Sequence, residues 1–74
     1  MEVRKRVAAN IKKFRKDLGL SQEELAFESG LHRTYISGLE RAIRNPTVTV
    51  LEKVAAGLQV PSYKLLQDER IVRK

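Results

Sequence analysis

The sequence predicts one compact all-α domain of five short helices, spanning residues 1–74. Apolar residues recur at spacings of three and four through most of the chain, which is the period of an α-helix. Glycine or proline interrupts this pattern at Gly19, Gly30, Pro46 and Pro61, where helices are expected to end or begin. The length suits a single core, because a domain of this size buries only about 60% of its unfolded surface.

The first helix is expected over residues 3–18. Its core-facing stripe has spacings of four, four, three and four and consists of Val3, Val7, Ile11, Phe14 and Leu18. Gly19 is placed to stop the helix. Basic residues crowd the opposite side, which we interpret as a solvated face that strengthens the field around an anionic partner. A membrane-surface or protein-binding face is the alternative.

Residues 21–40, SQEELAFESGLHRTYISGLE, indicate two short helices joined by one sharp turn. Ser21 and Glu24 form a capping box at the start of the first helix. Gly30 marks the turn, because glycine enters the left-handed conformation without a Cβ penalty. Leu31 and His32 then lead into the second helix, with His32 at its N-cap. This arrangement is a helix-turn-helix, and it points to DNA.

The second helix of this unit turns Ile36 and Leu39 inward, which leaves an outer face of Arg33, Thr34, Ser37, Gly38 and Arg41. Arginine pairs with the two acceptors of guanine, and hydroxyl groups donate to or accept from several bases. We therefore expect this face to read base edges, with Gly38 allowing close approach of DNA. The alternative for the outer face is that it is simply a solvated polar face. The alternative for Gly38 is that the helix merely tolerates a glycine there.

The fourth and fifth helices are expected over about residues 47–67. Thr47 caps the fourth helix, whose apolar residues are Val48, Leu51, Val54, Ala55 and Leu58. Pro61 interrupts the chain and Ser62 caps the fifth helix. A core this small does not easily hide every apolar residue that follows. We therefore expect a two-fold dimer interface at Val60, Tyr63, Leu65 and Leu66, extended by Ile71 and Val72. The alternative is that these residues complete the core of the monomer.

The segments GLSQEELA, SGLHRTYIS, LERAIRNPT and LEKVAAGLQVPSYKLL resemble the Cro/repressor-like helix-turn-helix family over about residues 7–67. Within that family, the sequences of these segments are similar to those of the controller proteins of restriction–modification systems. The resemblance implies a lambda-repressor-like fold, a dimer on DNA, and a structural ion pair between Arg15 and Glu40. The sequence leaves open whether such dimers assemble as a tetramer on DNA. The resemblance also implies DNA contacts by Gln22 on a phosphate, by Arg33 and Thr34 on bases, by Tyr35 and Ser37 on backbone or base edges, and by Arg41, Arg44 and Asn45 on flanking phosphates or groove.

Two positions depart from the family pattern. Ala42 stands where glycine usually ends the recognition helix, so the loop through Ile43 and Arg44 is expected to start later. Gln59 stands where a glycine commonly caps the fourth helix, and Gly57 comes two residues earlier.

The composition favours some classes of function and excludes others. A net charge of +6 and a pI of about 10.1 suit a polyanionic partner. There is no cysteine, so disulfide frameworks and thiolate zinc sites are excluded, and no metal or cofactor is expected. Catalysis has no support, since His32 is the sole histidine and no nucleophile or phosphate-loop motif is present. With no leader or membrane-spanning run in the sequence, we expect a cytoplasmic protein associated with the nucleoid.

The sequence therefore predicts a non-enzymatic, sequence-specific transcriptional regulator that binds a pseudo-palindromic DNA operator as a homodimer. As the resemblance implies, a controller protein activates at low level and represses at high level at its own promoter and that of the linked endonuclease gene. A prophage-type repressor or an antitoxin of the same fold is an alternative. A protein-interaction module that docks through Phe27 and the acidic second helix is another, and a basic amphipathic membrane binder is a third.

Overall fold

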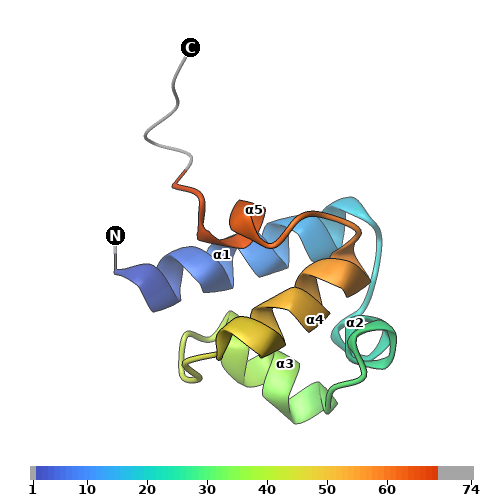
Figure 1. The fold of residues 1–74 in the computed structure, drawn as a ribbon. Coiled ribbons are helices and arrows are strands. Elements are labelled where there is room, and N and C mark those ends of the chain that lie inside the picture. The colour runs from blue at the N-terminus through green and yellow to red at the C-terminus, as the bar shows by residue number, and fades with distance from the viewer. Residues whose placement is uncertain (1, 69–74) are drawn as a thin grey trace.

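The computed structural model describes residues 2–68 and confirms the all-α prediction. These residues form five helices in chain order: α1 (Val3–Asp17), α2 (Gln22–Ser29), α3 (Arg33–Glu40), α4 (Val48–Leu58) and α5 (Tyr63–Leu66). In Figure 1, α4 packs mainly on α2, α1 packs on α3, and α5 lies against α1. Within the described part of the chain, no helix is both long and apolar enough to cross a bilayer.

One hydrophobic core joins all five helices. Its fully buried large side chains are Ile11 from α1, Leu25 from α2, Ile36 and Leu39 from α3, Val54 and Leu58 from α4, and Leu65 from α5. Gly57 faces Ser29 where α4 crosses α2. A Cβ built on Gly57 would lie 2.6 Å from the Ser29 Oγ atom, so a larger residue there would push these helices apart.

The capping signals in the sequence place the ends of the second helix correctly. The Ser21 Oγ atom accepts from the Glu24 amide at 3.0 Å, and the Glu24 carboxylate accepts from the Ser21 amide at 2.8 Å. Gly30 takes a left-handed φ of 70°, and the amide of Leu31 donates back to the Ala26 carbonyl at 2.9 Å. His32 is the N-cap residue of α3, although its side chain makes no capping hydrogen bond.

Ala42 and Gln59 stand where the family pattern has glycine, yet α3 and α4 end where a glycine would end them. Ala42 and Gln59 adopt left-handed φ values of 62° and 61° without being glycine. The expectation that the loop after α3 starts later is therefore wrong, because α3 already ends at Glu40. Backbone hydrogen bonds impose the turn at Ala42, since the amides of Ile43 and Arg44 both donate to one carbonyl, that of Gly38.

Several expectations about individual side chains are corrected. Val48 is 78% exposed and does not belong to the core, because it begins α4 at the protein surface. Val3 and Leu18, at the two ends of α1, are each 43% exposed. Ser62 does not cap α5 with its side chain, which donates instead to the Glu52 carboxylate at 3.0 Å. Thr47 caps α4 as predicted, accepting from the Val50 amide at 3.1 Å.

The short helix α5 is fixed to α1 by a buried amide. The Asn10 side chain donates to the carbonyls of Leu65 and Gln67 at 2.9 and 2.8 Å, which satisfies acceptors at the end of α5. The Leu65 side chain is fully buried in the core. The prediction that Leu65 lies in a dimer interface is therefore wrong, and the alternative that it completes the monomer core holds for this residue.

The other residues of the predicted interface differ in exposure. Tyr63 and Leu66 are 62% and 42% exposed, while Val60 is partly buried against the core. Ile71 and Val72 lie outside the described residues.

Candidate nucleic-acid interface

The outward face of α3 carries the residues that the sequence assigns to base reading. Arg33 and Thr34 are exposed at the start of the helix, whereas Ile36 and Leu39 are buried beneath it. Within the described residues neither Arg33 nor Thr34 has a side-chain hydrogen bond or ion pair. Ser37 is half-buried one turn later. The N-terminal end of α3 therefore presents a guanidinium group and a hydroxyl group that are not committed to the fold.

Gly38 has a role that differs from the predicted one. It is buried rather than exposed, and a Cβ built there would lie 2.7 Å from the Arg44 Cγ atom. The Arg44 guanidinium also lies over the Tyr35 ring, 5.2 Å from its centroid, as a cation–π pair. Gly38 thus makes room for the Arg44 side chain, and its assignment to the exposed reading face is corrected.

The ion pair implied by the resemblance is present and buried. The Arg15 Nε and Nη2 atoms donate to the two Glu40 carboxylate oxygens at 2.6 and 3.0 Å, in a bidentate arrangement. The two side chains are 12% and 2% exposed. Hydrogen bonding to Glu40 raises the pKa of Arg15 above its ordinary value, although burial acts in the opposite direction. The pair joins α1 to the last residue of α3.

Gln22 enlarges this network in a way that the sequence did not indicate. Its side-chain amide donates to the Glu40 carboxylate at 3.0 Å, so α1, α2 and α3 meet at one carboxylate. One of the two amide hydrogens of Gln22 is therefore used inside the protein, and the other is free to reach a phosphate. The position of Gln22, as the first residue of α2, also places it where the helix dipole favours an anion.

The remaining predicted contacts lie beyond the end of α3. Arg41 caps the helix, and Arg44 and Asn45 follow in the loop to α4, where all three are exposed. The predicted DNA contacts consequently occupy the first residue of α2, the length of α3 and the loop after it. The stacking of Arg44 on Tyr35 had no clear sequence signal, because it depends on the left-handed turn at Ala42.

Phe27 lies on the outer side of α2, away from the core. It is 84% exposed and has three glutamates near it on the same helix: Glu23, Glu24 and Glu28. A surface with an apolar centre and acidic surroundings does not suit contact with phosphates. The acidic side of α2 therefore differs in charge from the residues around α3, although its edge meets them where Phe27 and Glu23 line one hollow with Arg33 and Thr34.

Comparisons with known proteins support a DNA-binding identity. A family model described as helix-turn-helix matches residues 11–65. The control protein C.SmaI of Serratia marcescens is 44% identical over 66 residues, which are 89% of this chain and 79% of that protein. A hypothetical transcription factor of Neisseria meningitidis is 46% identical over 65 residues, 88% of this chain and 61% of that protein.

Solved structures show the same fold. The crystal structure of the hypothetical transcription factor NHTF from Neisseria has a TM-score of 0.90 at 43% identity, covering 93% of this chain and 79% of that one. The restriction–modification controller protein C.Esp1396I, solved as a tetramer in complex with its natural 35 base-pair operator, has a TM-score of 0.82 at 43% identity. That match covers 88% of this chain and 86% of the controller protein. The chain is thus a member of the helix-turn-helix family, to which its sequence, its fold and the geometry of α2 and α3 all assign it.

Proposed function

We propose that this protein is a sequence-specific, DNA-binding transcriptional regulator of the restriction–modification controller type. The observation that carries the proposal is the outward face of α3, where Arg33 and Thr34 are exposed and uncommitted above a rigid core. Both side chains suit base edges in a major groove. The similarity to C.SmaI and to the operator-bound C.Esp1396I supports the controller assignment.

In the proposed complex, α3 enters the major groove and the surrounding polar residues hold the backbone. Gln22 contacts a phosphate from the start of α2, and Tyr35 and Ser37 contact backbone or base edges. Arg41, Arg44 and Asn45 hold the flanking phosphates or groove. A net charge of +6 favours this partner, because each neutralised phosphate releases bound counterions. The regulator acts by binding alone, without catalysis or a cofactor, on DNA in the cytoplasm.

We propose that the protein binds DNA as a homodimer that uses the exposed Tyr63 and Leu66. Two-fold symmetry would place two copies of α3 about one helical turn apart, roughly 34 Å, on a pseudo-palindromic operator. Tyr63→Ala with Leu66→Ala should shift sedimentation from dimer to monomer at micromolar concentration while the unfolding of the monomer is little changed. A double variant that still sediments as a dimer would place the interface elsewhere.

The proposed function is tested by selecting bound duplexes from a random-sequence pool at near-physiological salt. We expect a two-fold symmetric motif with half-sites about 10 base pairs apart. Arg33→Ala should then cost about 1–3 kcal/mol of binding and relax selection at one base pair per half-site, whereas Arg41→Ala should weaken binding to every sequence alike. Equal losses on all sequences for Arg33→Ala would remove its base-reading role. Retention of DNA without any selected motif would reduce the function to non-specific binding.

Other regulators of this fold are the nearest alternative. A prophage-type repressor or an antitoxin would use the same residues on the same kind of operator. The genes beside the coding sequence distinguish them: a linked endonuclease and methyltransferase pair supports the controller assignment, and a linked toxin gene supports the antitoxin.

A second candidate function is docking of a protein partner through Phe27, which is favoured by its 84% exposure. Phe27→Ala and Arg33→Ala separate the two functions, because the residues lie on different helices and neither is buried. If DNA selection fails and a partner is retained by the wild type and Arg33→Ala but not by Phe27→Ala, the docking function replaces the regulatory one.

A further inference from the structure

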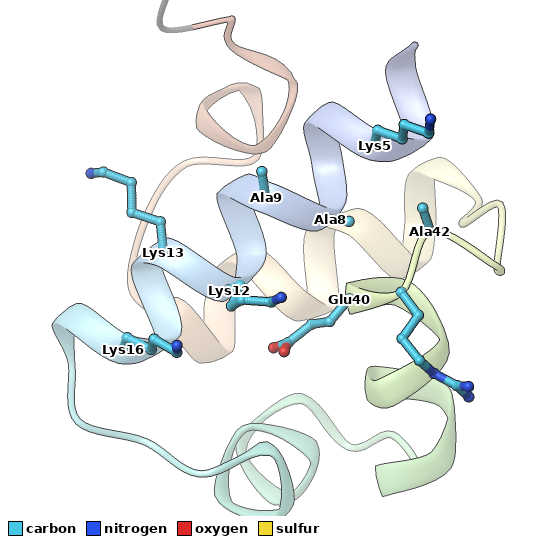
Figure 2. A pocket seen from close by; sticks show the side chains of 9 residues that line it. Lys5, Ala8, Ala9, Lys12, Lys13, Lys16, Glu40 and Ala42 are labelled. Carbon is cyan, nitrogen blue, oxygen red and sulfur yellow. The ribbon is translucent and has the colours of Figure 1, made fainter. Parts of the chain in front are cut away.

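A basic groove lies along α1, outside the set of DNA contacts assigned above. It has a volume of about 480 Å³. Its lining consists of Lys5, Ala8, Ala9, Lys12, Lys13 and Lys16 from α1, together with Glu40, Arg41 and Ala42 at the end of α3 (Figure 2). The alanines keep the floor of the groove low and apolar, while long cationic side chains form its walls.

The charge of this groove is positive and largely unpaired. Within residues 2–68, Lys5, Lys12 and Lys16 form no ion pair, and all three are exposed. Glu40 does not offset them, because its carboxylate is already held by Arg15 at 2.6 Å. Lys13 is set apart, since it points to the opposite side in Figure 2 and lies 3.6 Å from the Asp17 carboxylate.

The groove adjoins the reading face of α3. Thr34, Ser37 and Arg41 follow one another at spacings of three and four residues, so they share one side of the helix. Arg41 belongs both to this side and to the lining of the groove. The side of α3 that carries Thr34 and Ser37 therefore meets the lysine-lined groove of α1 at Arg41.

The dimensions of DNA favour a sugar-phosphate strand as the occupant. The eight residues of α3 are about 12 Å long, which matches the roughly 12 Å width of the major groove. Residues just beyond the C-terminal end of α3 would then lie at the edge of that groove, where the phosphates are. Unpaired ammonium groups at this place suit a phosphate chain, since each contact releases counterions.

We propose that the α1 groove binds the phosphate backbone of DNA that flanks the half-site read by α3, with Lys5, Lys12 and Lys16 as the contacting residues. This inference rests on the proposed function and adds a second contact region to it. The region reads no sequence, because phosphates carry none directly. It extends the footprint on DNA beyond the recognised bases.

The test compares two variants that remove the same charge. Lys5→Gln with Lys12→Gln removes two of the three proposed phosphate contacts from the groove. Lys53→Gln with Lys64→Gln removes two charges from α4 and α5, which do not line the groove. Glutamine and lysine have similar helix propensities, so both variants should fold, as circular dichroism and thermal unfolding will verify. Each protein is titrated against two duplexes carrying the selected motif. One duplex ends at the motif, and the other extends about 10 base pairs beyond each end.

On the extended duplex, the slope of log Kobs against log salt should fall by about 1.8 for the groove variant, at about 0.9 per lost phosphate contact. On the short duplex the two variants should have the same slope, and the preference for the motif over a scrambled sequence should be unchanged on both. Equal slopes for the two variants on the extended duplex would overturn the inference, and this is also the result if the groove holds an acidic protein surface. Loss of motif preference in the wild type would instead overturn the proposed function.

Discussion

Replacing Glu40 by alanine should strongly destabilise the fold. The substitution removes the two hydrogen bonds that Arg15 donates to Glu40, at 2.6 and 3.0 Å, and leaves only its bond to the Leu20 carbonyl. The guanidinium group, which is only 12% exposed, then has no counter-charge. Removing one partner of a buried pair costs about 3–5 kcal/mol. A domain of 74 residues has a free energy of unfolding of about 4–11 kcal/mol, so the loss is a large part of the total.

Urea unfolding followed by far-UV circular dichroism measures this loss. We expect a lower midpoint with an unchanged m-value, and a melting temperature lower by at least about 12 °C. The exposed Glu28→Ala is the matched control, with an expected change within about 0.5 kcal/mol. Because the pair raises the pKa of Arg15, its contribution to the free energy of unfolding is complete at neutral pH and declines only in strong alkali. The stability lost in Glu40→Ala should therefore be the same throughout the neutral range.

A double variant tests whether the cost of Glu40→Ala comes from the buried, unpaired charge that it leaves on Arg15. Arg15→Met with Glu40→Leu leaves no buried charge, so it should be more stable than either single variant. A cost below about 1 kcal/mol for Glu40→Ala, as for a surface ion pair, would refute this account.

Three further substitutions test other parts of the structure. Gly38→Ala places a Cβ 2.7 Å from the Arg44 Cγ atom and should displace that side chain, so operator affinity should fall to that of Arg44→Ala. Unfolding in urea should show no loss of stability, because alanine is the better helix former. Gln59→Gly relieves a left-handed φ of 61° and should raise the free energy of unfolding by about 0.5–1 kcal/mol, whereas Ala56→Gly, inside the same helix, should lower it by about 1 kcal/mol. Leu65→Ala should cost about 2–5 kcal/mol at every protein concentration, and a cost that depended on concentration would return this residue to a dimer interface.

The sequence predicted the helices well because their ends carry local signals. The capping box at Ser21 and the left-handed turn at Gly30 depend on a few neighbouring residues, which the sequence displays directly. Side-chain burial depends instead on which helix lies opposite. Periodicity placed Val48 with the core residues of α4, yet nothing in the sequence shows that the first turn of α4 projects beyond its neighbours.

The same distinction applies to the candidate site. Arg33 and Thr34 could be assigned to the outer face from the spacing of Ile36 and Leu39, and the structure places them there. The role of Gly38 could not be predicted from the sequence, because the Arg44 side chain reaches Gly38 only through the turn at Ala42. The lysines of α1 were expected to strengthen the field around the protein, and their alignment beside Arg41 requires the packing of α1 against α3.

The uncommitted side chains on α3 also bear on how such a regulator can diverge. Since Arg33 and Thr34 are exposed and make no side-chain hydrogen bond or ion pair within residues 2–68, replacing them changes the surface offered to DNA at little cost to folding. The core beneath them, and the carboxylate at which α1, α2 and α3 meet, stay the same. If Arg33 and Thr34 read bases as proposed, a lineage with this architecture can acquire a new operator by point substitution at two positions. Duplicated copies can then separate their targets while each remains folded at every step.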